Sequence, residues 1–340
     1  MESKLPLVSI CIPAYNAEKY IVSTIKSALN QTWQNKEIII VDDGSTDKTL
    51  KIAKVFESEN VKVFSQKNKG ASAARNYAYS LAKGDFIQWL DADDILAPNK
   101  IETQINYFIK NPDPLVLHSV PFRIFYHRLK SAKYNKTPLW QDLMPKDWLF
   151  YHLNDGAFMF PACWLVNRKI TDLAGPWDEN LTYNDDGEYF FRVVSKSKFI
   201  KFHPDTVCYY RKGNLSSISS SIIISGNAHK SLRKSIYMCI DHLLSIENSL
   251  ETRTACINAL NRIAPYKTNE KIEAWTEINN KIIELGGNIE QKKITPLFSL
   301  AINILDYKRA NNLRLTIYKI KVLLVSFFDK LNSIIYSDSI

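Results

Sequence analysis

Short apolar runs alternate with longer amphipathic segments through the first third of the chain. The apolar runs lie at residues 7–12, 37–41, 61–64, 86–90 and 115–120. Between them, apolar residues recur at helical spacing near residues 17–31, 46–58, 70–83 and 98–110. Strands that alternate with helices predict βαβ crossovers and a mainly parallel sheet flanked by helices, an α/β fold. Continuous apolar strands are typical of a sheet that is covered on both faces.

The pattern changes twice further along the chain. Residues 121–160 are rich in aromatics and prolines and show little periodicity, which predicts a long loop-rich connection. A helix near residues 184–196 and a strand near residues 199–210 follow. After Ser225 the sequence reads as successive amphipathic helices to about residue 335. We therefore predict an α/β domain over residues 1–222 and a C-terminal helical extension over residues 223–340.

Charge and cysteine content narrow the classes of partner and compartment. The chain has 44 Lys and Arg against 35 Asp and Glu, a net charge of +9, which suits an anionic partner such as nucleic acid, an acidic membrane surface or a phosphorylated small molecule. The five cysteines are scattered without a C-x-x-C pair, so neither a zinc site nor a disulfide framework is predicted. A reducing, cytoplasmic setting is expected. We find neither a signal peptide nor an apolar run of the roughly 18 residues that a membrane span needs.

Two polar clusters follow the first two predicted strands. Because ligands of open α/β sheets bind at the carboxyl edge of the strands, these positions carry more weight than polar clusters elsewhere. In the first cluster, Pro13 ends the strand and Tyr15 offers a flat face for a base. In the second, Asp42 can accept a hydrogen bond from a base or a ribose, and Gly44 permits a tight turn. The alternatives are an ordinary strand-to-helix turn for the first cluster and a capped turn with exposed acids for the second.

Two further clusters lie at the start of the third helix and after the fourth strand. Arg75 lies one turn into a helix, where its charge gains nothing from the helix dipole and needs another partner, unless it is simply solvated. Asp91, Asp93 and Asp94 repel one another unless a cation or hydrogen bonds compensate. Hard divalent cations favour such oxygen ligands together with substrate phosphates, whereas a solvated acidic turn is the alternative.

Together the four clusters resemble the family 2 glycosyltransferases, which have the GT-A fold. The resemblance covers residues 7 to about 212 and implies a nucleotide-sugar half over about residues 1–115 and an acceptor half over about residues 116–222. It implies that Tyr15 stacks on the nucleobase, that Asp42 binds the base with help from Arg75, and that Asp91 faces the ribose and Asp93 the metal. The implied donor site comprises Pro13, Tyr15, Asp42, Arg75, Asp91, Ala92 and Asp93, with Asp91 and Asp93 as ligands of Mn²⁺ or Mg²⁺.

A later acidic cluster carries the implied catalytic base. Members of the family often show a Glu-Asp pair whose aspartate deprotonates the acceptor, and this chain has Asp185 and Asp186 at that place. Asp186 is the better match, although Gly187 replaces the aromatic residue that often follows. Acids in the first turn of a helix are also favoured by the helix dipole alone. Arg211, after two tyrosines, is a further candidate for contact with the diphosphate.

The resemblance implies an inverting transfer from a nucleotide-diphosphate sugar, with a UDP-sugar as the expected donor. The acceptor is expected to be a hydroxyl of a glycan or a lipid-linked glycan, in cell-surface polysaccharide synthesis, with no nucleic acid as partner. A nucleotidyltransferase would share the nucleotide fold and the acidic site without needing the later aspartate. A non-catalytic scaffold in polysaccharide assembly is the second alternative.

The end of the chain has its own pattern. Apolar residues recur near helical spacing across residues 313–335, with Arg314, Lys319, Lys321 and Lys330 among them. Two interpretations stay open for the C-terminal helices: they dock on the catalytic domain, or they make peripheral contact with the inner face of an anionic membrane.

Overall fold

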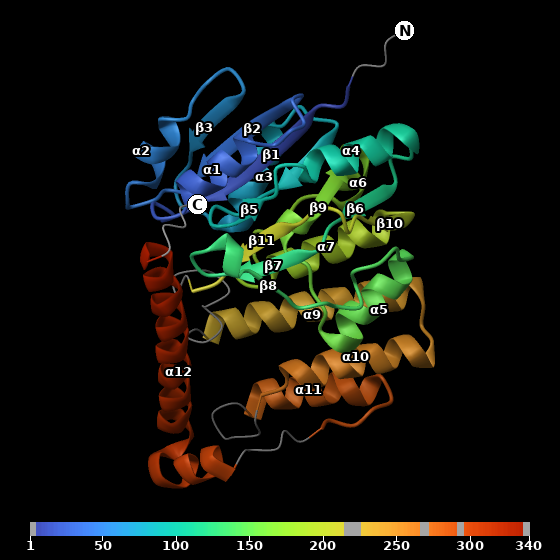
Figure 1. Cartoon of the computed structure of the whole chain (residues 1–340). Helices are drawn as coiled ribbons and strands as arrows, with labels where there is room; N and C mark the ends of the chain where they lie inside the picture. Colours follow the sequence, from blue (N-terminus) through green and yellow to red (C-terminus); the bar gives the residue numbers. More distant parts are fainter. Residues whose placement is uncertain (1–4, 214–225, 266–271, 291–295, 336–340) are drawn as a thin grey trace.

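The computed structural model of the chain describes residues 5–213, 226–265, 272–290 and 296–335. Its centre is a seven-stranded sheet in the order β10-β6-β9-β4-β1-β2-β3 (Figure 1). The strands are β1 Val8–Ala14, β2 Lys36–Asp42, β3 Val61–Ser65, β4 Phe86–Trp89, β6 Val116–Ser119, β9 Trp164–Asn167 and β10 Phe199–Phe202. Only β9 runs antiparallel to its neighbours β4 and β6, so the prediction of a mainly parallel α/β sheet is confirmed.

The helices predicted between these strands are present. They are α1 Ile21–Leu29, α2 Thr49–Lys54, α3 Ala71–Leu81, α4 Lys100–Lys110 and α7 Asp185–Lys196. A further helix that was not predicted, α6 Arg168–Ala174, follows β9. Helix α3 packs on β1 and β2, and α6 packs on β4 and β9. All seven residues of β1 are buried, as the continuous apolar run predicted.

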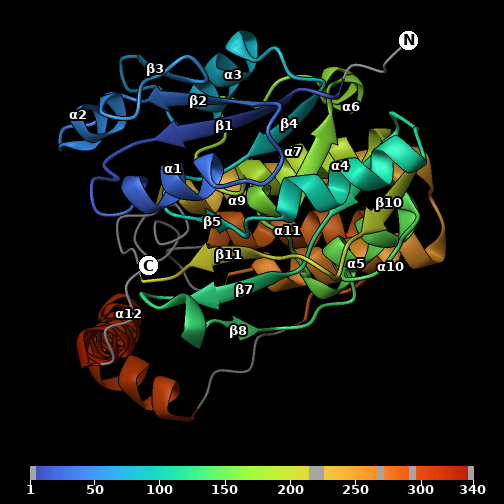
Figure 2. The same ribbon diagram turned by 45° about the horizontal axis from the view of Figure 1, so that its top comes forward.

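A smaller sheet lies beside the first and corrects the prediction for residues 199–210. Its strands are β5 Ile95–Leu96, β7 Phe122–Phe125, β8 Lys133–Tyr134 and β11 Cys208–Arg211, in the order β5-β11-β7-β8 (Figure 2). The single strand predicted there is two strands, because β10 belongs to the large sheet and β11 to the small one. The chain changes sheets through a turn that contains Pro204, and proline cannot donate to a strand ladder.

The prediction that residues 121–160 form a loop-rich connection is wrong in one respect, because the segment contains regular secondary structure. It contains β7, β8, a short 3₁₀ turn at Leu129–Ser131 and the helix α5 Pro145–Asp155. Pro145 stands in the first turn of α5, and Gly156 ends the helix in the left-handed region with φ 67°. Proline at the start and glycine just past the end are ordinary helix boundaries. Because polar and apolar residues are mixed between these two positions, helical periodicity did not predict this helix.

The predicted helical extension is confirmed as helical, and its first helices complete the core. It comprises α9 Gly226–Ile246, α10 Leu250–Ile263, α11 Ile272–Glu284 and α12 Pro296–Ile335. Helix α9 packs on α7, and α10 packs on α5. Ile240, Leu260 and Ile282 are fully buried in the same apolar cluster as β1. The boundary predicted near residue 222 lies outside the described residues.

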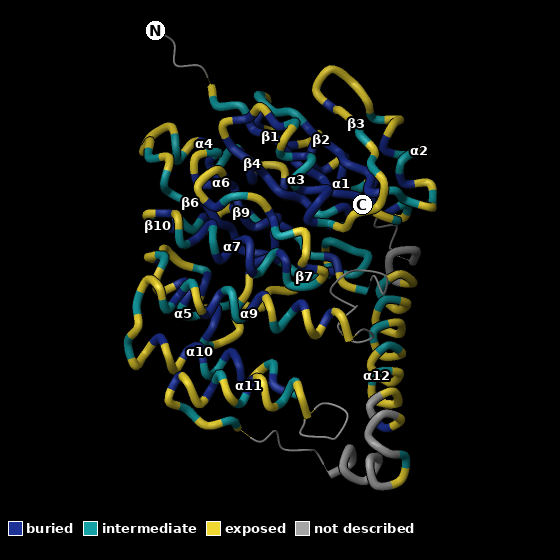
Figure 3. The backbone as a smooth tube through the Cα atoms, turned by 180° about the vertical axis from the view of Figure 1, so that it is seen from behind, coloured by how far each residue is buried: buried dark blue, intermediate teal, exposed yellow. Residues whose placement is uncertain are grey.

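Helix α12 stands at the side of the molecule, and Figure 3 shows most of its described length as exposed. Within the described residues, we find no helix with an apolar stretch of the length that a bilayer crossing requires.

Candidate functional site

The predicted site residues gather around one cavity of about 760 Å³ at the carboxyl edge of the large sheet. The ends of β1 and β4 and the first turns of α3 and α7 all reach it, because parallel strands end at the same edge. Its volume lies within the range of small-molecule sites. The predicted residues that line it are Pro13, Tyr15, Arg75, Asp91, Ala92, Asp93 and Asp186.

Arg75 joins the two acidic clusters. Its guanidinium donates to Asp91 Oδ1 at 2.8 Å and to Asp185 Oδ2 at 2.7 Å, and it lies 4.3 Å from the ring centre of Trp177. Burial alone would lower the pKa of Arg75, but the charges of Asp91 and Asp185 raise it above its ordinary value. Both terminal amino groups are therefore engaged by the protein itself, and a contact of Arg75 with a nucleotide stays a prediction.

Asp185 and Asp186 face different partners. Asp185 accepts from Arg75 and, at 3.2 Å, from the hydroxyl of Ser72. Asp186 lines the cavity, and its Oδ1 accepts only the backbone N–H of Gly187 among the hydrogen bonds of the described residues, at 2.9 Å. Burial and then the neighbouring charge of Asp185 raise the pKa of Asp186 to about 7, and Arg75 opposes the shift. A carboxylate with a pKa near neutrality is suited to exchange a proton.

The acidic turn after β4 presents two of its three carboxylates to the cavity. Asp91 and Asp93 line it, whereas Asp94 is buried and accepts the backbone N–H of Arg211 at 2.9 Å. Burial, followed by the charges of Asp93 and Asp91, raises the pKa of Asp94 well above its ordinary value. The turn thus concentrates negative charge at the cavity wall, which is what a bound cation would neutralise.

Arg211 supports this turn from the neighbouring strand. Its Nε donates to the backbone carbonyl of Asp93 at 2.8 Å and its Nη1 to the carbonyl of Tyr126 at 3.0 Å. The side chain is buried, yet it lines the cavity. The structure therefore shows Arg211 holding the acidic turn, and its contact with a diphosphate stays a prediction.

The turn after the second strand contributes Asp43, which was not predicted as a site residue from the sequence. Asp42 is buried behind the cavity, where its Oδ2 accepts Ser45 N–H at 3.1 Å, and it does not line the wall. Asp43 lines it instead, with its carboxylate held by the backbone N–H groups of Lys69 and Gly70 at 2.9 and 2.8 Å. Within the described part of the chain, Asp42 Oδ1 has no hydrogen-bond partner. The only feature of the sequence that pointed to Asp43 was its position next to Asp42 in the same motif.

The other side of the cavity was not predicted from the sequence. It is mainly apolar and aromatic and comes from α5, the loop after it, α9 and α10. Among the described residues, the buried indole N–H of Trp148 on this side has no hydrogen-bond partner. The lining residues here include Trp148, His152, Phe158, Met159, Phe160, Ile236, Ala259, Arg262 and Ile263. No local pattern marks them, because they meet only when the extension packs on α5.

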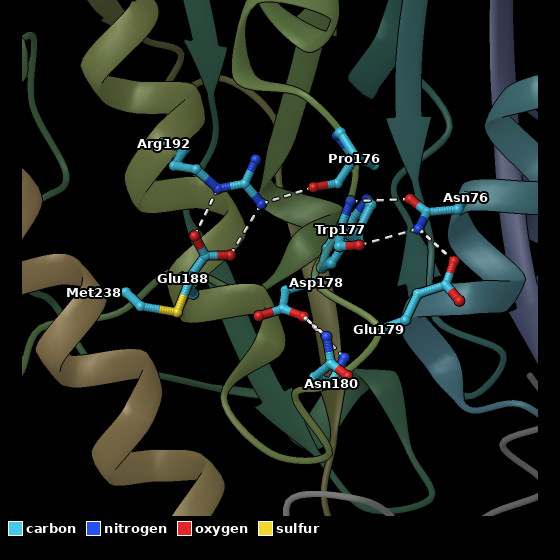
Figure 4. Close-up of a pocket in the computed structure, with 9 residues that line it drawn as sticks. All are labelled: Asn76, Pro176, Trp177, Asp178, Glu179, Asn180, Glu188, Arg192 and Met238. Carbon is cyan, nitrogen blue, oxygen red and sulfur yellow. Dashed lines mark hydrogen bonds and ion pairs between the residues drawn. The ribbon is translucent and has the colours of Figure 1, made fainter.

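A second hollow of about 510 Å³ lies beside the cavity and shares Glu179 with it (Figure 4). Its polar groups bind one another: Asn76 donates to the carbonyl of Trp177 at 3.0 Å and to Glu179 at 2.9 Å. Arg192 pairs with Glu188 at 2.6 Å. The Asn76 contacts brace the segment before α7 against α3, which carries Arg75, and the Arg192–Glu188 pair lies within α7, which carries Asp185 and Asp186.

The mainly parallel sheet, with a cavity at its carboxyl edge and an acidic turn on the cavity wall, agrees with the predicted GT-A fold. The solved structure of S. aureus TarS in complex with UDP-GlcNAc matches with a TM-score of 0.64 and 17% identity, over 91% of this chain and 89% of that one. At this identity the likeness shows the fold alone.

The sequence comparisons identify the family. The family model described as glycosyl transferase family 2 matches residues 9–173. Glycosyltransferase GlyG of Streptococcus pneumoniae is 32% identical over 61% of this chain and 71% of its own length. Chondroitin synthase of Escherichia coli is 32% identical over 68% of this chain and 33% of its own. The chain belongs to the family 2 glycosyltransferases. It spans 44%, 60% and 33% of the lengths of three of the curated relatives that it matches.

Proposed function

We propose that this protein transfers a sugar, with inversion, from a nucleotide-diphosphate donor to a hydroxyl of a glycan or a lipid-linked glycan. The observation that carries the proposal is the placement of Asp186. It lies in the same cavity as the acidic turn, and burial with the charge of Asp185 brings its pKa to about 7. A nucleotidyltransferase has the acidic site but needs no such base.

The donor occupies the side formed by β1, β2 and α3 in this proposal. Tyr15 is half exposed at the rim, where its ring face can stack on a base. The unpartnered Oδ1 of Asp42 suits a donor N–H of the base, and a small movement of the β2 turn would bring them together. A UDP-sugar is the proposed donor. The relatives include the Escherichia coli chondroitin synthase, and we extend a role in polysaccharide synthesis to this chain on that basis.

Asp91 and Asp93 would hold Mn²⁺ or Mg²⁺ together with the donor diphosphate. The described residues contain no ready-made cluster of three His, Cys, Asp or Glu side chains. Mg²⁺ nevertheless is often held by one or two carboxylates plus substrate phosphates, and the two carboxylates at the cavity wall fit that requirement. When bound, the cation would stabilise negative charge on the departing diphosphate. Arg75 keeps Asp91 in place, and Arg211 supports the backbone at Asp93.

The acceptor hydroxyl lies against Asp186 in this proposal. Ionised Asp186 takes the proton from the hydroxyl while the oxygen attacks the anomeric carbon from the side opposite the diphosphate. The aromatic side of the cavity would hold the acceptor sugar. We also propose a cytoplasmic location at the inner face of the membrane, where lipid-linked acceptors are exposed and where C-terminal helices can make peripheral contact.

The function is tested with the purified chain and a panel of nucleotide sugars, with release of nucleoside diphosphate and mass-detected transfer as the readouts. We expect hydrolysis and transfer from a UDP-sugar, lost on chelation and restored by Mn²⁺. Asp93→Ala should lower both rates by about a hundredfold or more, comparable to removing a major electrostatic contact of a transition state. Asp205→Ala, which removes an exposed acid elsewhere, is the control. Release of pyrophosphate instead of nucleoside diphosphate, or full activity of Asp93→Ala, would contradict the proposal.

A further inference from the structure

Exposed apolar surface is concentrated on α12. Of the 25 large apolar side chains that are exposed in the described part of the chain, eleven lie on this helix. Phe328 is 60% exposed, Ile317 58% and Phe327 55%. Contiguous apolar surface of this kind marks a protein or membrane contact, whereas single exposed apolar residues need no explanation. We therefore expect a partner surface to cover helix α12.

The polar anchor of α12 determines which face points away from the molecule. The carboxylate of Asp329 accepts the backbone N–H groups of His127 and Arg128 at 2.8 and 3.1 Å, and Ser326 bonds to His127 at 2.8 Å. Ser326 and Asp329 are three residues apart and share one face of the helix.

Because each residue turns the helix by about 100°, the side opposite this anchored face carries an apolar stripe. The stripe therefore lies on the side of α12 away from Ser326 and Asp329, and Figure 3 colours most of the described residues of this helix as exposed. Its exposed members are Leu313, Ile317, Ile320, Leu324, Phe328 and Leu331.

The charges on the helix identify the kind of partner. Residues 309–331 contain five Lys or Arg and a single acid, Asp329. Burial would raise the pKa of Asp329, but hydrogen bonds from the 127–131 segment hold it below its ordinary value, so this acid stays ionised and turned inward. The exposed cations Arg314 and Lys321 lie seven residues apart on one flank of the stripe.

In a dimer through this helix, residues 309–331 of the two copies would bring ten Lys or Arg together with only the two inward Asp329 side chains, which disfavours a second copy of this chain as the partner. Anionic headgroups would neutralise these cations, at about 1 kcal/mol for each Lys or Arg near the surface.

We propose that α12 lies flat on an anionic membrane surface, with the stripe 313–331 in the interface and the flanking cations among the headgroups. This inference specifies the membrane contact in the proposed location, and it does not depend on the proposed sugar transfer.

The test is flotation of the full chain with vesicles of phosphatidylcholine alone and of phosphatidylcholine with phosphatidylglycerol. We expect binding to the anionic vesicles that weakens with salt. Ile317→Asp should lower the partition coefficient roughly tenfold, from the loss of one buried apolar side chain. Ile283→Asp on α11 is the matched control, because Ile283 and Ile317 are both 58% exposed.

Charge is tested separately from apolar contact. The double change Arg314→Glu and Lys321→Glu should lower partition by at least about thirtyfold, because two cation contacts are lost and two charges that repel anionic headgroups are added. The control is Lys51→Glu with Lys54→Glu, two exposed cations of α2. Donor hydrolysis without vesicles should be unchanged in every variant, which separates a failure of this inference from a failure of the proposed function.

Three results would overturn the inference: no binding to anionic vesicles, equal binding to both vesicle types, or equal effects of the variants and their controls. A concentration-dependent dimer in sedimentation that Ile317→Asp dissociates would instead assign the stripe to a second copy of the chain.

Discussion

Asp185 and Asp186 are neighbours in the sequence but occupy different electrostatic surroundings. Asp185 is paired with the buried guanidinium of Arg75, whereas half-buried Asp186 lies beside this charge without a cation of its own within hydrogen-bonding distance among the described residues. The two adjacent carboxylates therefore have different chemical roles. The first holds the site together, and the second has a pKa at which it can take a proton.

The change Asp186→Asn should slow sugar transfer by about 10²–10⁴-fold, because positioned base catalysis contributes roughly that much. Donor affinity, measured by calorimetry, should be unchanged. Transfer by the unchanged protein should rise with pH through about 7, since the base must be ionised. The rate of the Asn variant should lack this rise.

The same change has a second readout in stability. The pKa of Asp186 is raised from 3.8 to about 7 in the folded protein, so its contribution to stability is present below pH 3.8 and is lost as the pH rises to about 7. Asp186→Asn should therefore melt at a higher temperature than the unchanged protein at pH 8, with a smaller difference at pH 5. Asp185→Asn should melt lower at pH 8, because it removes a partner of buried Arg75. The opposite pattern would mean that the two roles are exchanged.

At the scale of secondary-structure elements, helix α10 stabilises the end of helix α5. Arg262 of α10 donates to the carbonyl groups of Leu153 and, at 2.6 Å, of Asn154 at the end of α5. These carbonyls have no partner within their own helix, so the arginine satisfies them. The loop after Gly156 then turns Phe158 toward the cavity. A helix of the extension thereby determines where part of the proposed acceptor site lies.

The change Arg262→Ala should raise the KM for acceptor about tenfold, because two carbonyl groups lose their partner and the loop that follows loosens. The donor Kd should stay within twofold of the unchanged protein, since the donor side lies on other elements. Arg253→Ala, an exposed arginine of the same helix, is the control. Initial rates at varied acceptor and fixed donor measure the effect. Equal weakening of donor and acceptor binding would show instead that Arg262 supports the whole cavity.

The helical extension has two parts at the scale of the whole molecule. Helices α9, α10 and α11 bury residues in the same core as the central sheet, whereas α12 stays mostly exposed and is anchored at Asp329. We propose on this basis that residues 1–222 do not form an independent folding unit. The catalytic body extends to about residue 290, and α12 is an appendage.

A chain that ends at residue 213 should not fold as a monomer. It would expose the faces of α5 and α7 and lose buried residues such as Ile240 and Leu260, each of which contributes roughly 1.5–3 kcal/mol against a total stability of about 5–15 kcal/mol. A chain that ends at residue 290 should stay monomeric and melt within a few degrees of the full chain. Size-exclusion chromatography and thermal melting distinguish the two. A stable, monodisperse chain 1–213 would contradict this division.

The amino-acid sequence by itself determined the fold class and the position of most of the predicted donor residues. Continuous apolar strands and amphipathic helices depend on local spacing, so β1 to β4 and α1 to α4 were predicted near their observed places. Polar clusters after strands meet at one edge for the same reason, and Tyr15, Arg75, Asp91 and Asp93 all line the cavity. The local pattern also indicated α7, which begins at Asp185.

Only the tertiary structure decided which groups pair and which line the cavity. Arg75 and Asp185 are 110 residues apart, and their contact depends on how α3 and α7 pack. Whether Asp42 or Asp43 faces the cavity depends on the turn after β2, which the residue types leave open. The aromatic side of the cavity and the inward direction of Asp329 arise from helices that meet across long separations. Such contacts follow from the burial of apolar faces against distant partners, and local periodicity carries no information about which partner that is.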